Sequence, residues 1–401
     1  MNGTAESSHP RRALPGSIWA LGLVSLFMDT SSELVHSLLP ILMSTVLGAS
    51  VATIGLIEGV AEATAAISKV FSGAISDYFR KRKILVLLGY GLAAFTKPVF
   101  PLAPSIGWVF AARFVDRIGK GIRGAPRDAL VADIVPPEMR GAAYGLRQAL
   151  DSVGAFAGPL LAVVFMALLA NNIRAVLWIA VIPAFICVAL IVFGVKEPDD
   201  AQSASPRKRL DFTAAKRLSR RYWLIVGLGA VFTLARFSEA FLILRARDVG
   251  LAIGFVPLIM IVMNVVYSAC AYPAGAAADR LPPRTLLVAG LAMLIVSDAL
   301  LAAASSPHLA FVGAGFWGLH MAFTQGLLSK LIADTAPDEL RGTAFGVFNL
   351  VSGIALLLAS VIAGALWTAL GPAATFLAGA AFAAVAAAGL LFVRPRARSA
   401  S

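Results

Sequence analysis

The sequence predicts an all-α membrane protein in which twelve transmembrane helices form two six-helix bundles. Composition is the first reason, because 59% of the 401 residues are hydrophobic and the mean hydropathy is +0.83. Charged residues make up 14% of the chain, whereas about 25% is typical of soluble domains. The second reason is a series of twelve apolar runs, and the third is a pair of motifs that occurs once in each half of the chain.

The apolar runs follow one another along the chain, separated mostly by short polar turns. Most contain about 20 residues or more, which is enough for a helix to cross a bilayer. They lack the alternation of polar and apolar residues that marks a membrane-spanning strand. We therefore expect one helix from each run. The approximate limits are 17–46, 53–76, 84–103, 106–134, 142–169, 175–195, 223–245, 251–276, 285–304, 308–334, 343–368 and 372–393.

The longest polar break lies between the sixth and seventh runs and is rich in Lys and Arg. It predicts three parts of the chain: an N-terminal six-helix bundle in 1–195, a basic cytoplasmic linker in 196–222, and a C-terminal six-helix bundle in 223–401.

Two motif pairs indicate that the halves are repeats of one unit. Residues 132–141 and 333–342 match at six of ten positions with an offset of 201. Gly73-x-x-x-Asp77 and Gly275-x-x-x-Asp279 are separated by 202. Because each unit has an even number of helices, both halves enter the membrane the same way round. Such parallel repeats are related by a pseudo-twofold axis, and a solute site typically lies between them near the bilayer midplane.

The positions of Lys and Arg predict the orientation in the membrane. These residues gather in alternate polar segments, including both chain ends and the central linker. The positive-inside rule then places both termini in the cytoplasm of a multi-pass plasma-membrane protein, such as one of the bacterial inner membrane. The net charge of +12 is explained by this topology. We therefore expect contact with membrane lipid and no nucleic-acid partner, and we expect a monomer.

Three titratable residues share one stripe of the first run. Asp29, Glu33 and His36 are spaced i, i+4 and i+7, so they project from the same side of a helix. A carboxylate at membrane depth costs several kcal/mol. We expect the stripe to face a water-filled cavity or partners on other helices. The alternatives are a structural ion pair with a basic residue of the fourth run and a divalent-metal site formed by these three residues.

Further charges lie inside other runs, where burial requires a partner of opposite charge. The second run carries two acids and the fourth carries several cations, which predicts either a cavity lining or an internal ion-pair network. Arg236 and Glu239 have the i, i+3 spacing of a helical pair in the seventh run. With the first-run stripe, the candidate coupling and solute residues are Glu58, Glu62, Arg113, Arg117, Lys120 and Asp151.

The chain resembles the major facilitator superfamily over nearly its whole length. Residues 73–83 are similar to the family's loop signature between helices two and three, although Tyr78 and Arg80 depart from it, and residues 275–284 resemble its second copy. The resemblance implies a cytoplasmic latch that holds one conformation and breaks in the other. Positive-inside charge alone is the alternative. The latch residues would be Gly73, Asp77, Arg80, Arg82, Asp279 and Arg280.

Two more motifs carry the resemblance. Residues 113–121 are similar to the fourth-helix signature, which implies that Arg113 relays protons or acts on the solute. Gly154-x-x-x-Gly158-Pro159 resembles the fifth-helix pattern of exporters. It implies a hinge or a barrier to leakage, and close helix packing is the alternative.

By this resemblance, the chain is expected to be a secondary active transporter. The expected activity is proton-coupled antiport that exports a small amphipathic or charged solute by alternating access, with protonation of Asp29 or Glu33 weakening a pair with Arg113 or its neighbours. Alternatives are an uptake symporter, a divalent metal-ion exporter using Asp29, Glu33 and His36, and a non-transporting membrane sensor. The sequence has no Gly-x-Ser-x-Gly or His-Glu-x-x-His motif, so we expect neither an enzyme nor a cofactor.

Overall fold

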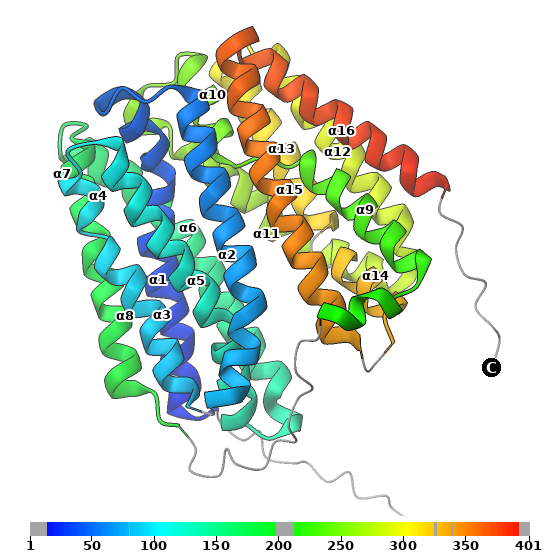
Figure 1. The fold of residues 1–401 in the computed structure, drawn as a ribbon. Helices are drawn as coiled ribbons and strands as arrows, with labels where there is room; N and C mark the ends of the chain where they lie inside the picture. Colours follow the sequence, from blue (N-terminus) through cyan, green and yellow to red (C-terminus); the bar gives the residue numbers. More distant parts are fainter. Residues whose placement is uncertain (1–13, 80, 198–211, 325–326, 338–339, 393–401) are drawn as a thin grey trace, which may run out of the picture.

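The computed structural model describes residues 14–79, 81–197, 212–324, 327–337 and 340–392 (Figure 1). Regular structure in these residues is entirely helical. The elements of the N-terminal half are α1 (Gly16–Ile41) with its π-helical extension η1 (Leu42–Val46), α2 (Val51–Phe79), α3 (Arg82–Thr96), α4 (Val99–Leu102), α5 (Ile106–Ile134), η2 (Pro137–Met139), α6 (Arg140–Leu168), α7 (Ile173–Ile179) and α8 (Val181–Gly194).

The C-terminal half repeats this layout with one long helix or two shorter ones for each predicted run. Its elements are η4 (Phe212–Arg217), α9 (Arg220–Leu234), α10 (Ala240–Asp248), η5 (Ile253–Phe255), α11 (Leu258–Arg280), α12 (Pro283–Ala303), α13 (Pro307–Thr324), α14 (Leu327–Thr335), α15 (Arg341–Leu370) and α16 (Pro372–Phe392). Each of the twelve apolar runs therefore falls on helix, as the sequence predicts.

Nine helical segments of the described chain are long and apolar enough to cross a membrane on their own. The other three predicted spans are α5, the α9–α10 segment and the α13–α14 segment. α5 is rich in charge, and α9 and α10 are each short. All three pack beside apolar spans of their own half: α5 on α2 and α3, α9 on α15 and α16, and α13 on α11 and α12.

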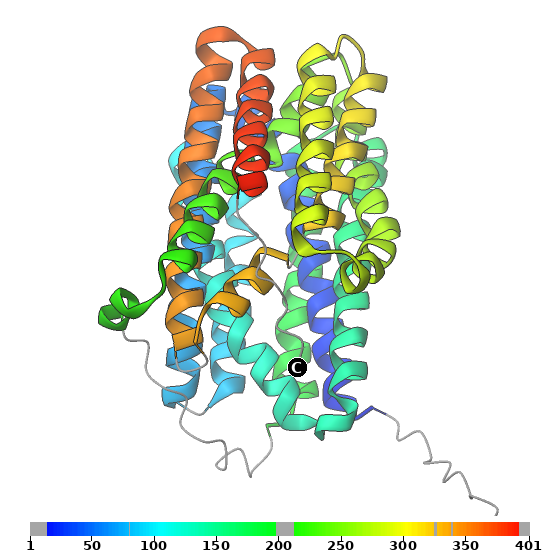
Figure 2. The ribbon, with the colours of Figure 1, turned by 90° about the vertical axis from the view of Figure 1, so that its right-hand side faces the viewer.

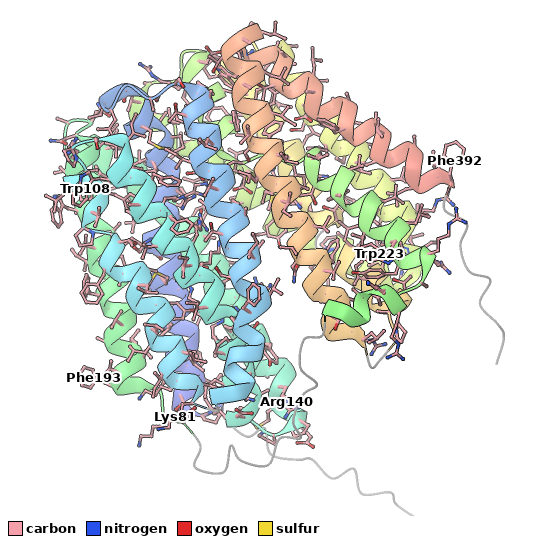
Figure 3. The ribbon with its side chains drawn as sticks, in the orientation of Figure 1. Lys81, Trp108, Arg140, Phe193, Trp223 and Phe392 are labelled. Carbon is pink, nitrogen blue, oxygen red and sulfur yellow. The ribbon has the colours of Figure 1, made fainter. Side chains whose placement is uncertain are left out.

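The outer surface of the bundles is apolar, as lipid contact requires. Large hydrophobic side chains such as Phe193 and Phe392 are exposed by 83% and 86%. Figure 3 shows labelled aromatic residues on the outside of both halves, with Lys81 and Arg140 together at one end. In water such exposure would be costly, so the surface is that of a protein embedded in a bilayer.

The two halves form separate bundles that meet mainly at α2 with α15, α6 with α11, and α1 with α10. Figure 1 shows α2 and α15 touching at the end where α10 lies and diverging toward the end where α1 begins, and Figure 2 shows the bundles from the side. At the closed end, the Ala52 backbone N–H donates to Thr368 Oγ1 over 3.2 Å.

Glycines make the α2–α15 contact close. A Cβ atom on Gly55 would collide with the backbone oxygen of Ser360, and one on Gly364 would lie 2.9 Å from the backbone oxygen of Val51. Small residues let helix backbones approach each other inside a membrane. We call this α2–α15 contact, formed around Gly55, Gly59, Ser360 and Gly364, the glycine seam.

Most of the predicted linker, residues 198–211, lies outside the described residues. α9 begins at Arg220, inside the range assigned to the linker. The division into 1–195, 196–222 and 223–401 therefore stays a prediction, while the two-bundle architecture is observed.

Candidate functional site

A cavity of about 470 Å³ lies between the two bundles. The N-terminal half contributes side chains from α1, α2, α5 and α6, and the C-terminal half contributes the segment between α9 and α10 together with α11, α13 and α15. Because each wall belongs to a different bundle, rocking of the bundles would change the shape and the access of the cavity. The charged and titratable side chains of its lining are Asp29, Glu33, His36, Glu62, Arg117, Lys120, Asp151, Arg236 and Glu239.

The predicted stripe of α1 faces this cavity. Asp29, Glu33 and His36 all line it, because i, i+4 and i+7 positions share one side of a helix. His36 Nδ1 lies 3.5 Å from Glu33 Oε2. Asp29 instead faces Asp151 of α6, and their carboxyl groups are within hydrogen-bonding reach. Two carboxylates this close together repel each other unless a proton or a cation lies between them.

The three stripe residues do not converge on one point, as a metal site would require. His36 pairs with Glu33, while Asp29 faces Asp151. In the part of the chain that the structure describes, no group of three or more His, Cys, Asp or Glu side chains is placed to hold a metal ion. The geometry does not favour the metal-exporter alternative.

Arg113 and Glu58 form a buried, bidentate ion pair between α5 and α2. Arg113 Nη2 donates to Glu58 Oε2 over 2.7 Å and Arg113 Nε donates to Glu58 Oε1 over 3.2 Å. Both residues are almost fully buried, with 2% and 0% exposure. Arg113 therefore pairs with Glu58 and not with Asp29 or Glu33, while a pair of either acid with a neighbouring cation stays a prediction. The reason is that α2 packs directly on α5, whereas the acids of α1 point into the cavity.

A second pair joins the same two helices at the cavity edge. Arg117 Nη2 lies 3.1 Å from Glu62 Oε1, and both residues line the cavity. Lys120, one turn further along α5, also lines the cavity, where it is exposed and close to Asp29, Glu33 and Glu62. The α5 cations therefore lie in two environments. Arg113 is buried in the contact between α2 and α5, whereas Arg117 and Lys120 face the cavity.

One buried pair escaped the sequence reasoning. Lys97 Nζ donates to Asp116 Oδ1 over 2.9 Å and to Ser32 Oγ over 3.1 Å, and both charged residues are at least 96% buried. This contact ties the α3–α4 junction to α5 and α1. The sequence contains a signal for this pair, because Lys97 is a single lysine inside an apolar run and a buried cation requires an acid nearby.

The fifth-helix glycines pack against α1. A Cβ on Gly154 would lie 2.5 Å from the Leu26 backbone oxygen, and one on Gly158 would lie 2.7 Å from the Thr30 backbone oxygen. α6 runs without interruption through Pro159. The glycines thus bring Asp151 of α6 close to Asp29 of α1, and a hinge at Pro159 stays a prediction.

Valine in place of Gly158 is expected to lower the free energy of unfolding by about 1–3 kcal/mol, the usual cost of overpacking a close contact. The measurement is thermal unfolding of the purified protein in detergent, followed by tryptophan fluorescence. Gly145→Val in the same helix is the matched control, because a Cβ there meets nothing within 4 Å. Equal losses in both variants would contradict the assignment of Gly158 to the α1–α6 contact.

The predicted latch residues lie near the end where the halves diverge. Gly73 and Asp77 are in the last turns of α2, and Asp279 and Arg280 end α11. Arg80 and the side chains of Asp77 and Asp279 lie outside the described part of the structure. The Arg82 side chain pairs with Asp133, within the N-terminal bundle. A latch across the two halves stays a prediction.

The seventh predicted helix, 223–245, is broken in the middle. α9 ends at Leu234 and α10 begins at Ala240. The Ser238 backbone N–H, which has no helical acceptor, donates to Ser360 Oγ of α15 over 3.2 Å. The Phe237 ring packs against Trp317 and Phe376, with ring centroids 5.4 and 5.6 Å away. Arg236 and Glu239 are therefore not a helical pair but part of an unwound segment that lines the cavity.

Comparisons with known proteins agree with this architecture. A family model described as the Major Facilitator Superfamily matches residues 21–262 and 232–401. An uncharacterised MFS-type transporter of Methanocaldococcus jannaschii is 33% identical over 391 residues, which cover 95% of this chain and 96% of that protein.

Two further similarities are more distant. A class C tetracycline resistance protein of Escherichia coli is 25% identical over 292 residues, which cover 70% of this chain and 72% of that protein. The crystal structure of a D-xylose-proton symporter superposes with a TM-score of 0.75 at 16% identity, covering 95% of this chain and 98% of that one. At this identity the structural match shows a shared fold.

Proposed function

This chain belongs to the Major Facilitator Superfamily, and we propose that it is a proton-coupled antiporter that exports a small amphipathic or charged solute. Family membership makes it a multi-pass membrane transporter of a small molecule rather than an enzyme. The proposal concerns the coupling ion, the direction of transport and the residues that carry out the exchange.

The observation that carries the proposal is the Asp29–Asp151 pair at the cavity wall. Two carboxylates held close together repel each other unless a proton or a cation lies between them. When the shared proton leaves, Lys120 is the nearby cation of the same wall that can compensate for the added negative charge. A positively charged group of the solute among the acids of the cavity disfavours a proton on this pair, because like charges repel, so binding of one weakens binding of the other. This mutual exclusion is what antiport requires.

Rocking of the bundles is expected to deliver each ligand to the opposite side. A ligand shifts the balance between two conformations only if it binds one of them better. The positive-inside rule indicates that the diverging end of the bundles faces the cytoplasm. In that orientation, the solute enters from the cytoplasm and displaces the proton, and the reverse exchange takes place after the bundles close at that end.

Two observations support export. Gly154-x-x-x-Gly158-Pro159 resembles the pattern of exporters, and one relative is named a tetracycline resistance protein. A transporter protects a cell against a drug when it lowers the internal concentration of the drug. We extend the direction of transport, but not the substrate, to this chain.

The test uses proteoliposomes that contain a trapped pH-sensitive dye and carry an imposed pH gradient. Candidate organic cations, anions and zwitterions are added in turn, and the proton flux that each one triggers is recorded. We expect the wild-type protein to exchange protons for at least one class. Asp29→Asn and Asp151→Asn are expected to abolish the coupled proton flux, because neither variant can share a proton between two carboxyl groups.

Asp334→Asn is the matched control, because Asp334 is exposed on α14, away from the cavity. Glu33→Gln is expected to change the affinity for the solute but to keep coupling, because Glu33 pairs with His36. Coupled flux that survives in both Asp29→Asn and Asp151→Asn would overturn this assignment. Proton and solute movement in the same direction would indicate symport instead.

A further inference from the structure

The unwound segment of the seventh span places opposite charges on the cavity wall. Residues 236–239 lie between α9 and α10, and all four line the cavity. Interrupted helices near the midplane commonly form solute and ion sites in transporters, because their free backbone groups and side chains can reach the solute. This segment supplies most of the charge that the C-terminal half brings to the cavity.

The guanidinium of Arg236 has no ionic partner among the described residues. Glu239, Tyr267 and His320 are titratable neighbours of Arg236, yet no ion pair or side-chain hydrogen bond joins it to any of them. An arginine stays charged under all ordinary conditions. A charge that is partly withdrawn from water in this way favours binding of an anionic group, which can accept two parallel hydrogen bonds.

Glu239 forms no ion pair with a described residue, although Arg236 is a neighbour in the same segment. It lies near His36 of the opposite half and near two acids there, Glu33 and Glu62. Those two already have partners, because Glu33 is 3.5 Å from His36 and Glu62 is 3.1 Å from Arg117. Like charges that face each other across a cavity repel unless a cation lies between them. The position beside Glu239 is therefore suited to a positively charged group.

An apolar surface separates the two charges. Phe237, between Arg236 and Glu239 in the chain, lines the cavity together with Trp317, and their ring centroids are 5.4 Å apart. A chain segment of three residues spans at most about 10 Å. A single small molecule can therefore contact both charges and the aromatic surface.

We propose that the solute is a small zwitterion whose carboxylate binds Arg236, whose ammonium group binds Glu239, and whose apolar part packs on Phe237 and Trp317. This inference rests on the proposed function, since it assigns a solute class to the same cavity. A simple cation leaves Arg236 without a partner, and a simple anion leaves Glu239 without one. A zwitterion satisfies both and adds no net charge to the cavity.

The test compares three probes that share a phenyl ring and differ in charge: phenylalanine, phenethylamine and 3-phenylpropionate. Binding is measured as the concentration-dependent rise in melting temperature of the purified protein in detergent. We expect phenylalanine to bind most tightly to the wild type. The advantage over either singly charged probe is expected to be about ten- to a hundredfold, the effect of one hydrogen-bonded contact to a charged group.

Two variants remove the charges of Arg236 and Glu239 one at a time. Arg236→Gln is expected to reduce phenylalanine binding to the level of phenethylamine, whose own binding stays unchanged. Glu239→Gln is expected to reduce phenylalanine binding to the level of 3-phenylpropionate. Because the probes are compared on the same protein sample, a fraction of misfolded protein lowers all three signals together and leaves their ratio intact. Arg140→Gln and Glu138→Gln, both at exposed positions, are matched controls that should keep the wild-type order.

The proposal is overturned if none of the three probes raises the melting temperature, if a singly charged probe binds as well as phenylalanine, or if the two variants leave phenylalanine binding unchanged. Failure of the proposed function gives a different result. In that case phenylalanine shows the expected charge dependence, but its movement into proteoliposomes triggers no proton flux.

Discussion

Removal of either partner of the Glu58–Arg113 pair is expected to lower the free energy of unfolding by about 3–5 kcal/mol, because the remaining charge stays buried without compensation. Glu58 is completely buried and Arg113 nearly so, and two hydrogen bonds join them. Transport is expected to fail in Glu58→Gln and Arg113→Gln, because the α2–α5 contact holds the Glu62–Arg117 pair at the cavity edge.

The double variant Glu58→Gln/Arg113→Gln distinguishes an ion pair from simple packing. It removes both charges, so we expect it to be more stable than either single variant, which gives a negative coupling energy in the double-mutant cycle. The measurement is the midpoint of thermal unfolding in detergent, with size-exclusion chromatography to check that each variant remains monodisperse.

Arg147→Gln is the control for this series, because Arg147 pairs only loosely with Asp151 and Asp128, at 4.0 and 3.9 Å. It is expected to cost less than about 1 kcal/mol, because both separations are long and the two acids are partly exposed. If the double variant is as unstable as the sum of the two single variants, Glu58 and Arg113 do not stabilise the bundle as a pair.

The positions of the helices follow from local features of the sequence. The run predicted at 106–134 and the observed α5 (Ile106–Ile134) share both limits, because hydrophobic length and short polar turns are properties of neighbouring residues. The stripe of Asp29, Glu33 and His36 was predictable for the same reason, since helical periodicity alone places the three side chains on one side.

The partners of charged residues depend on how distant helices pack, which the spacing of residues along one helix does not contain. Arg113 pairs with Glu58 rather than with Asp29 or Glu33 because α2 lies against α5. The break between α9 and α10 was missed for a similar reason. Residues 235–239 contain neither Pro nor Gly, and the unwound backbone is held by Ser360, more than 100 residues away in the chain.

α2 links the ion pairs to the interface between the halves. Glu58 and Glu62 pair with cations of α5, and Gly55 and Gly59, on an adjoining face of the same helix, contact α15. A change in the charge of Glu58 or Glu62 therefore acts on the same helix that forms the glycine seam. This arrangement connects the electrostatics of the cavity with the contact that closes one end of the transporter.

Valine at Gly55 is expected to open the glycine seam and to abolish transport. Its side chain would collide with the backbone of Ser360 and crowd the Phe241 ring, because a Cβ at this position lies 3.1 Å from that ring. Each overpacked position costs about 1–3 kcal/mol, and that cost applies only to conformations in which α2 and α15 touch at this end. The variant therefore shifts the population toward conformations that are open at the seam.

Labelling of a single cysteine measures this shift. Leu357→Cys places a thiol at the seam, since a Leu357 side-chain atom lies 3.2 Å from the Cβ position of Gly59. The background is Cys270→Ser, with the buried Cys187 left in place. We expect a membrane-impermeant maleimide to react about ten times faster when Gly55→Val is added, which corresponds to a shift of about 1.4 kcal/mol between the closed and open forms.

Gly91→Val is the control, because a Cβ at Gly91 in α3 meets nothing within 4 Å. It should leave both labelling and transport at the wild-type level. Unchanged labelling in Gly55→Val, together with intact transport, would show that the bundles close without close contact at the glycine seam. Alternating access would then depend on the α1–α10 and α6–α11 contacts instead.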